Sequence, residues 1–218
     1  MRGCVAPTAC KVMQPLLHTG PPRTQRLFEA RSTQEKELHE NTSLTAEPSC
    51  KDEARVGQKG SLSYVWAPVG SRPPMVRDNR HDTAYIFGAI CPARGVGAAM
   101  LTPTANTECM NLHLAEISTQ VRPGARAVLV CDGAGWHQTG GDLVVPDNII
   151  LLHLPPYAPE LNPMENVWDY LRANKLSALV WDSYDAILQA CREAWIFLVN
   201  DPDRIRSIGT RDWATVSI

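Results

Sequence analysis

The sequence lacks any pair of cysteines spaced as in a zinc site or a disulfide-rich domain. Its seven cysteines are scattered, and none forms a Cys-x-x-Cys pair. Neither a zinc site nor a disulfide framework is therefore indicated. Cys91 and Cys131 end apolar runs, a position in which cysteine usually serves as a small buried hydrophobic residue. This usage fits a reducing compartment, and we expect a cytoplasmic protein.

Long apolar runs are also missing. No stretch approaches the roughly 18 consecutive apolar residues that a membrane-spanning helix needs. The segment from Met1 to Gln14 includes Pro7 and Lys11 and has no continuous apolar centre, unlike a secretory signal. We therefore expect no association with a membrane.

The chain has no excess of basic charge, since its formal net charge is −2. A protein that handles DNA needs Lys or Arg wherever it neutralises a phosphate, so local basic patches would have to provide them. We select Arg55 and Arg72 as candidate DNA contacts. For each of them a solvated surface position is the alternative. Further residues available for such a patch are Lys59, Arg77 and Arg80.

Length and composition predict one domain with an N-terminal appendage. The 218 residues are 44% hydrophobic, which suits a protein with a substantial core. Residues 1–50 hold Pro7, Pro15, Pro21, Pro22 and Pro48 and show little sustained periodicity. We expect this segment to be poorly ordered, although it could hold one helix. The globular domain is expected over residues 51–218.

Apolar patterns predict strands first and then helices alternating with strands. Ser61–Trp66 alternates as a strand does, and a Pro-Ala-Arg-Gly turn joins two further strands into an antiparallel hairpin. Val128–Cys131 and Ile149–Leu154 are short continuous runs, as in central strands covered on both faces. This order predicts an α/β fold with a mixed sheet flanked by helices. The two hairpin strands are expected at residues 83–91 and 97–101. Helices are expected at residues 106–121, 163–174 and 182–199.

Asp132 directly follows the strand Val128–Cys131 and precedes Gly133-Ala134-Gly135. Glycines let the chain turn sharply away and leave the carboxylate unobstructed. Open sheets bind ligands at the carboxyl ends of their strands, which is where this carboxylate is expected. The alternative is an aspartate that only begins a turn.

Glu165 is expected in the first turn of the helix that begins at Pro163. With Asn162 as the N-cap, Glu165 completes a capping-box pattern and would bond back to the Asn162 amide. Glu165 also flanks the apolar face of this helix, from which it could point toward a neighbouring strand end. Both interpretations remain open.

Together, Asp132 and Glu165 suit a hard divalent cation. Mg²⁺ takes oxygen ligands and usually lies on one or two carboxylates plus substrate phosphate. Two such ions can activate an attacking oxygen and stabilise a leaving one in phosphodiester chemistry. That arrangement needs a third acidic residue on a neighbouring strand, and the first candidate upstream is Asp52.

Four stretches carry a resemblance to a known family: Asp52–Arg55, Val65–Pro68, Leu129–His137 and Leu154–Trp168. The last stretch contains Pro-Pro-Tyr-Ala-Pro-Glu-Leu-Asn-Pro-Met-Glu-Asn-Val-Trp and is the most specific. Through them, residues 51–213 resemble the catalytic domain of insertion-sequence transposases of the DDE type, the branch allied to mariner elements.

The resemblance implies a ribonuclease-H-like fold and a metal triad of Asp52, Asp132 and Glu165 that holds two Mg²⁺ or Mn²⁺ ions. It implies hydrolysis of a DNA phosphodiester at an element end, followed by attack of the freed 3′-hydroxyl on target DNA. No covalent protein–DNA intermediate is required. The implied partners are transposon ends and target DNA, with a homodimer expected by analogy.

His137 is a weaker candidate in the stretch after Asp132. It could touch a DNA phosphate or the outer shell of the metal site, or it could be a surface or packing residue. Trp136 could stack on a base, and a core aromatic is the alternative.

Two features depart from the family pattern. Residues 1–50 are too few and too weakly patterned for the helix-turn-helix modules that normally precede this catalytic domain. Pro48 lacks the donor that a central strand needs, and Glu47 and Lys51 are costly to bury. The strand leading to Asp52 is therefore expected to be missing or badly formed, as in a truncated frame. The alternative to an active transposase is an inactive remnant that at most binds DNA or associates with a full-length transposase.

Overall fold

The computed structural model describes residues 45–57, 68–71, 81–137, 141–155, 158–177 and 179–210. Over these residues, five strands form one sheet in the order β3-β2-β1-β4-β5. β1, β4 and β5 run parallel, whereas β2 is antiparallel to both of its neighbours. The predicted mixed sheet is therefore confirmed, while the strand expected at residues 61–66 lies outside the described residues. The strands are β1 (Thr45–Gly57), β2 (Thr83–Cys91), β3 (Val96–Thr102), β4 (Ala125–Cys131) and β5 (Ile149–His153).

The predicted hairpin is formed by β2 and β3, which pair from Cys91↔Val96 to Tyr85↔Thr102. The amide of Gly95 donates to the carbonyl of Cys91 across 2.9 Å and closes the turn. Gly95 has a φ of 65°, a left-handed conformation that glycine adopts without steric cost. The turn therefore forms where the Pro-Ala-Arg-Gly sequence predicts it.

The expectation of a missing strand ahead of Asp52 is wrong, because β1 is the central strand of the sheet. It begins at Thr45, ahead of the domain boundary that the sequence suggested at residue 51. Pro48 is tolerated because residues 45–49 of β1 pair with β4 alone, and β2 joins only from Cys50 onward. A proline can face the open side of a half-paired strand without losing a ladder hydrogen bond.

The charges of Glu47 and Lys51 in β1 are tolerated because each of them lies beside a charge of the opposite sign. Glu47 is 6% exposed, and its carboxylate lies 3.2 Å from Arg94 and 3.5 Å from Arg122. Lys51 is fully buried and forms an ion pair with Glu53 two residues further along the strand. Buried charges persist when they are paired in this way.

The described helices are α2 (Thr107–Gln120), α3 (Pro163–Leu171), α4 (Tyr184–Val199) and α5 (Pro202–Gly209). Side chains cap α2 and α4: Asn106 accepts from the amide of Cys109, and Ser183 accepts from the amide of Ala186. α5 was not predicted, since it has only eight residues. None of the described helices combines the length and the apolar character of a membrane span.

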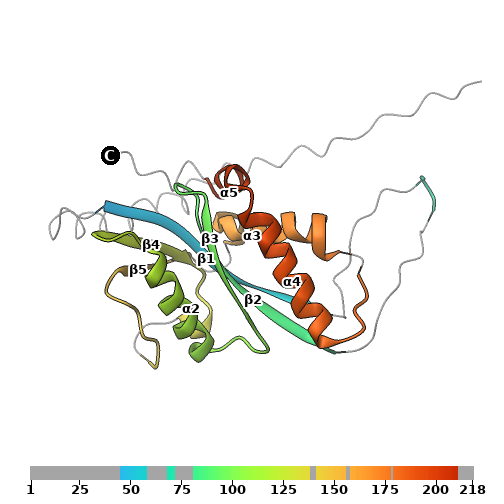
Figure 1. Ribbon diagram of the computed structural model, residues 1–218, viewed down its shortest axis with the longest axis horizontal. Helices are drawn as coiled ribbons and strands as arrows, with labels where there is room; N and C mark the ends of the chain where they lie inside the picture. The colour runs from blue at the N-terminus through green and yellow to red at the C-terminus, as the bar shows by residue number, and fades with distance from the viewer. Residues whose placement is uncertain are drawn as a thin grey trace, which may run out of the picture.

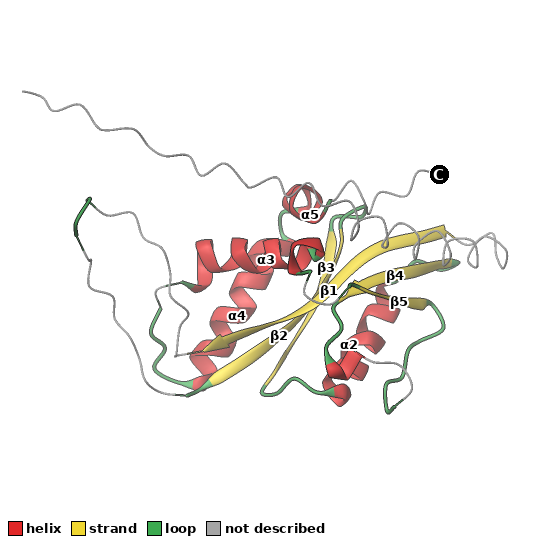
Figure 2. Ribbon diagram, turned by 180° about the vertical axis from the view of Figure 1, so that it is seen from behind, coloured by secondary structure: helices red, strands yellow, loops and turns green. Residues whose placement is uncertain are grey.

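The helices cover the two faces of the sheet unequally. Figures 1 and 2 show α2 on one face and α3, α4 and α5 on the other. Side-chain alternation in β2 explains this division, since Ile86 and Ile90 join the core beneath α3 and α4 while Phe87 joins the core beneath α2. The carboxylates described next lie at and beside the central strands of this three-layer arrangement.

Candidate active site

Strand register places Asp52 and Asp132 at the same level of the sheet. β1 and β4 are parallel and pair up to Cys50↔Val130. Asp52 follows Cys50 by two residues, and Asp132 follows Val130 by two, so the two aspartates continue the same register. Asp132 lies just beyond the end of β4 with its side chain 52% exposed. One predicted pair of site residues is thus brought together at the carboxyl end of a strand.

Asp52 is held from the α3 side of the sheet. The indole Nε1 of Trp168 donates a hydrogen bond to Asp52 Oδ2 across 3.0 Å. Burial raises the pKa of Asp52 to about 7, with the negative charges of Glu53 and Asp132 adding to the rise and the Trp168 bond opposing it. An aspartate with such a pKa is one that an added positive charge would stabilise in its ionised form.

A glycine makes room for the contact between Trp168 and Asp52. Gly88 of β2 pairs directly with Asp52. A Cβ atom on Gly88 would lie 2.6 Å from the Trp168 ring and 2.9 Å from the Trp195 ring. These two indole rings pack against each other with centroids 6.2 Å apart. The bare backbone of Gly88 therefore lets α3 approach the strand that carries Asp52.

Glu165 lies in the first turn of α3, three residues before Trp168. Asn162 caps this helix by accepting a hydrogen bond from the Met164 amide across 3.1 Å. Among the hydrogen bonds of the described residues, none joins the Glu165 carboxylate to the Asn162 amide, so the capping box is not formed. Burial raises the pKa of Glu165, and the charge of Asp132 adds to the rise. Glu165 is thus close enough to Asp132 for their charges to interact.

Asp52, Asp132 and Glu165 offer only carboxylate oxygens, which is the donor set that Mg²⁺ and Mn²⁺ prefer. Asp132 is close enough to each of the other two for its charge to raise their pKa values. Over the described residues, no three His, Cys, Asp or Glu side chains converge closely enough to hold one ion. What suits these three residues to a divalent cation is thus their oxygen donors and their negative charge.

His137 lies beside Asp132 and is fully buried. It belongs to a short 3₁₀ turn, Gly135–His137, and its Nδ1 is 2.7 Å from Asp132 Oδ1. Its Nε2 lies 3.0 Å from Glu53 Oε1 and 2.6 Å from Lys51 Nζ. Of the roles that the sequence left open for His137, a place beside the candidate metal ligands fits this geometry, whereas a phosphate contact would require exposed surface.

Lys51 and Glu53 were missed by sequence reasoning as members of this site. They flank Asp52 in β1, and strand alternation directs them to the opposite face of the sheet. Lys51 also lies 5.1 Å from the centre of the Phe87 ring, in the core beneath α2. Glu53 directly follows Asp52 in the sequence, which is a signal that could have drawn attention to it. The sequence contains no signal for its contact with His137.

The predicted DNA contacts are only partly described. Arg55 is exposed on β1, whereas Arg72 lies outside the described residues, as do Lys59, Arg77 and Arg80. The side chain of Trp136 is likewise outside the described part. Arg55 therefore remains a candidate DNA contact.

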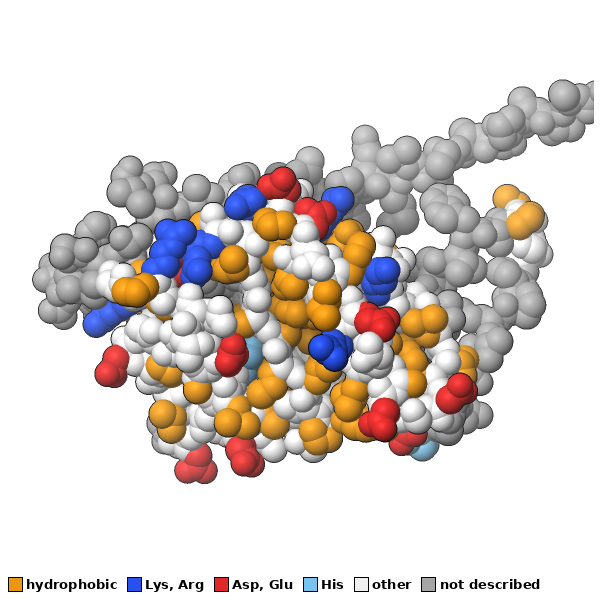
Figure 3. Space-filling model, in the orientation of Figure 1, with side chains coloured by type: hydrophobic (Ala, Val, Ile, Leu, Met, Phe, Trp, Pro, Cys, Tyr) orange, Lys and Arg blue, Asp and Glu red, His pale blue; other side chains and the backbone are white. Residues whose placement is uncertain are grey.

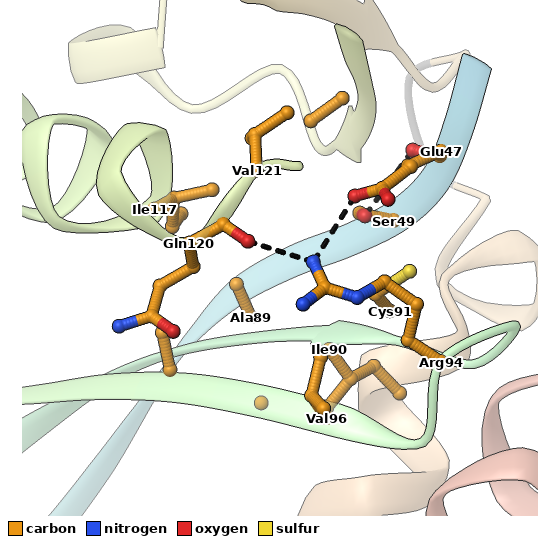
Figure 4. A pocket seen from close by; sticks show the side chains of 13 residues that line it. Glu47, Ser49, Ala89, Ile90, Cys91, Arg94, Val96, Ile117, Gln120 and Val121 are labelled. Atoms are coloured by element: carbon orange, nitrogen blue, oxygen red, sulfur yellow. Dashed lines mark hydrogen bonds and ion pairs between the residues drawn. The ribbon is translucent and has the colours of Figure 1, made fainter. Parts of the chain in front are cut away.

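Basic side chains gather at the other end of the sheet, where β1 and β4 begin (Figure 3). Arg94 and Arg122 lie there, because both form ion pairs with Glu47. Arg126 lies near the start of β4, where its backbone pairs with Ala46. Figure 4 shows the pocket there, with Arg94 directed at Glu47 and donating to the carbonyl of Gln120 across 2.7 Å. Glu47 precedes Asp52 by five residues, or roughly 17 Å of strand, so this pocket is separate from the carboxylates.

Comparisons with known proteins bear on the family and the fold of this chain. A family model described as DDE superfamily endonuclease matches residues 49–187. An uncharacterized protein of Sinorhizobium fredii (strain NBRC 101917 / NGR234), y4pE/y4sA, is 54% identical over 131 residues, which are 60% of this chain and 96% of that protein.

Two solved structures resemble the fold. The crystal structure of the Mos1 mariner paired end complex with Mn aligns with a TM-score of 0.54 at 17% identity, over 96% of this chain and 68% of that one. A pre-cleavage Mos1 transpososome aligns with the same TM-score and identity, over 93% of this chain and 68% of that one. At this identity the likeness establishes the fold alone, and the predicted ribonuclease-H-like fold is confirmed.

Proposed function

The chain belongs to the DDE superfamily of endonucleases, and from this premise we propose that it cuts DNA at the ends of a mobile element and joins them to target DNA. The observation that carries the proposal is the placement of Asp52 and Asp132 at one level of adjacent parallel strands. The proposal is further supported by α3, which carries Glu165 three residues before Trp168, the residue whose indole donates to Asp52.

Asp52, Asp132 and Glu165 would hold two Mg²⁺ or Mn²⁺ ions. When bound, such ions activate an attacking oxygen and stabilise a leaving one in phosphodiester chemistry. The protein's own contribution is to place three carboxylates on a strand, a strand end and a helix. Because burial raises the pKa of Asp52 and of Glu165, a bound cation would stabilise the ionised carboxylates that burial disfavours.

The substrates in this proposal are transposon ends and target DNA. The Mos1 structures are described as a paired end complex and a transpososome, and we extend that kind of assembly to this chain. Two ends handled together need two catalytic domains, so a homodimer is part of the proposal. Arg55 is the described residue that we assign to contact DNA.

A plasmid carrying the element's own flanking DNA tests the proposal. Purified full-length protein with Mn²⁺ should nick this plasmid at the element ends, and both Asp132→Asn and Glu165→Gln should abolish nicking. Arg192→Gln, an exposed change on α4 away from the carboxylates, serves as the control and should cut normally. Cutting that persists in both carboxylate variants would contradict the assignment.

The alternative function is that of an inactive remnant that binds DNA or associates with a full-length transposase. One of its two grounds, a missing strand ahead of Asp52, does not hold, because β1 is present. The same plasmid assay separates the two functions, because a remnant would retain the DNA in a gel without nicking it under any metal condition. Cutting without dependence on the end sequence would instead indicate a general nuclease.

A further inference from the structure

A buried group of polar side chains lies next to Asp132 and takes no part in the carboxylate triad. It consists of His137, Glu53 and Lys51, whose side chains are at most 7% exposed. Asp132 itself is half exposed. A half-exposed carboxylate at a strand end is ordinarily free to rotate. The contact with the fully buried His137 ring restricts the Asp132 carboxylate, and the question is what this restriction does.

The Nδ1 atom of His137 must carry a hydrogen. It lies 2.7 Å from Asp132 Oδ1 and 3.1 Å from the backbone carbonyl oxygen of the same residue. Both of these atoms are acceptors, so a ring nitrogen without hydrogen would face two lone pairs. The hydrogen bond therefore runs from His137 to Asp132 whether or not the second nitrogen, Nε2, is also protonated.

The His137 ring cannot turn away from Asp132, because its other atoms are also held. Nε2 contacts Lys51 Nζ and Glu53 Oε1, both from the central strand β1. The amide of His137 donates to the Ala134 carbonyl across 2.9 Å, and the His137 carbonyl accepts from His153 Nε2 across 2.8 Å. The ring is thus held by β1, and the backbone of His137 is held by β5 and by its own turn.

The two carboxylate oxygens of Asp132 consequently differ. Oδ1 accepts from His137 Nδ1 and from the Ala134 amide across 3.1 Å. The hydrogen bonds found over the described residues do not engage Oδ2. An oxygen with two donors is a poorer metal ligand than one without, so this arrangement leaves Oδ2 as the better ligand.

We propose that His137 is the positioning residue of the site: it fixes Asp132 through Oδ1 and so presents Oδ2 to the divalent cation. This inference rests on the proposed function and assigns His137 no contact with DNA. Hydrogen-bond partners that orient a metal ligand typically change metal affinity by 10–100-fold when they are removed.

A matched pair of variants tests the role of His137. Asparagine places an amide N–H where Nδ1 lies, and leucine has the same branched shape without a donor. Both variants lose the contacts of Nε2, so only the bond to Asp132 distinguishes them. With full-length protein titrated with Mn²⁺ in a calorimeter, His137→Leu should bind about tenfold or more weakly than wild type, and His137→Asn should recover most of that loss.

The control is Asp132→Asn in the same titration. Wild-type affinity in Asp132→Asn would overturn the proposed metal site itself. Lost affinity in Asp132→Asn, together with equal affinities in His137→Leu and His137→Asn, would overturn only the positioning role. A purely structural histidine would lower the melting temperature of both His137 variants equally and leave their Mn²⁺ affinities alike.

A spectroscopic measurement covers the case in which the leucine variant does not fold. Histidine-selective ¹⁵N labelling of the metal-free wild-type protein should give a His137 Nδ1 signal with a directly bound proton. A His137 Nδ1 without a proton would overturn the inference, because the bond to Asp132 could not then exist.

Discussion

Trp168 donates its indole hydrogen to Asp52 across 3.0 Å, and this bond connects the helix of one candidate ligand with the strand of another. Glu165 precedes Trp168 by three residues, or nearly one helical turn, so the two lie on adjacent parts of the same helix surface. A shift of α3 would therefore disturb the position of Glu165 and the environment of Asp52 together.

Replacing Trp168 by phenylalanine should test this connection. The variant keeps an aromatic ring but leaves a buried carboxylate oxygen without its donor, which costs about 1–3 kcal/mol of unfolding free energy. Urea denaturation should find a greater loss in Trp168→Phe than in Trp195→Phe, where a neighbouring indole changes without affecting the Asp52 bond. Equal losses would mean that the bond contributes nothing.

Gly88→Ala should destabilise the protein, because the added methyl group meets both indole rings. Overpacking of this kind costs about 1–3 kcal/mol. Gly141→Ala is the matched control, since nothing lies within 4 Å of its added Cβ. Thermal melts of the two variants should differ clearly, and combining Gly88→Ala with Trp195→Leu should restore part of the loss. A Gly88→Ala melt that matches the control would refute the close approach of α3.

Arg94→Met should reveal what β1 requires in order to hold Glu47. Removing one partner of a buried ion pair usually costs 3–5 kcal/mol, and we expect about 2 kcal/mol here because Arg122 remains 3.5 Å from the carboxylate. Adding Glu47→Gln in the same chain should recover much of the loss, since no charge is then left buried. If the losses in free energy of unfolding caused by Arg94→Met and Glu47→Gln simply add in the double variant, the pairing would be contradicted.

His113 should make the protein sensitive to acid. Burial lowers the pKa of His113 to about 3, with the charge of Lys51 adding to the effect, from 6.5 in the unfolded chain. Between these values the unfolded chain binds the proton and the folded one does not, so stability falls as the pH falls below 6.5. The melting temperature of wild type should drop more steeply from pH 6.5 to 4 than that of His113→Leu. Parallel curves would indicate that His113 titrates normally.

Much of the architecture could be predicted because it depends on local sequence patterns, namely apolar periodicity and turn residues. The hairpin is predicted by a turn sequence between two apolar strands. The position of Asp132 at a strand end is predicted by the short apolar run before it. The strand before Asp52 could not be predicted in this way. Glu47 is tolerated there because of Arg94 and Arg122, and these residues reach β1 only in the folded chain.

Tertiary contacts also explain why the burial of His137 beside Asp132 was not predicted. The sequence places His137 five residues after Asp132, and the local pattern does not indicate whether it faces solvent. Its burial results from Lys51 and Glu53 on β1 and from His153 on β5. These contacts join residues from separate strands, so they depend on tertiary packing that local periodicity does not encode.

The most direct test of the account is a crystal of the full-length protein grown with Mn²⁺ and measured at a wavelength where manganese scatters anomalously. We predict manganese peaks bonded to oxygens of Asp52, Asp132 and Glu165, with Oδ2 as the Asp132 ligand. Manganese bound elsewhere, such as at Glu47, or a well-ordered site without manganese at saturating Mn²⁺, would contradict the account.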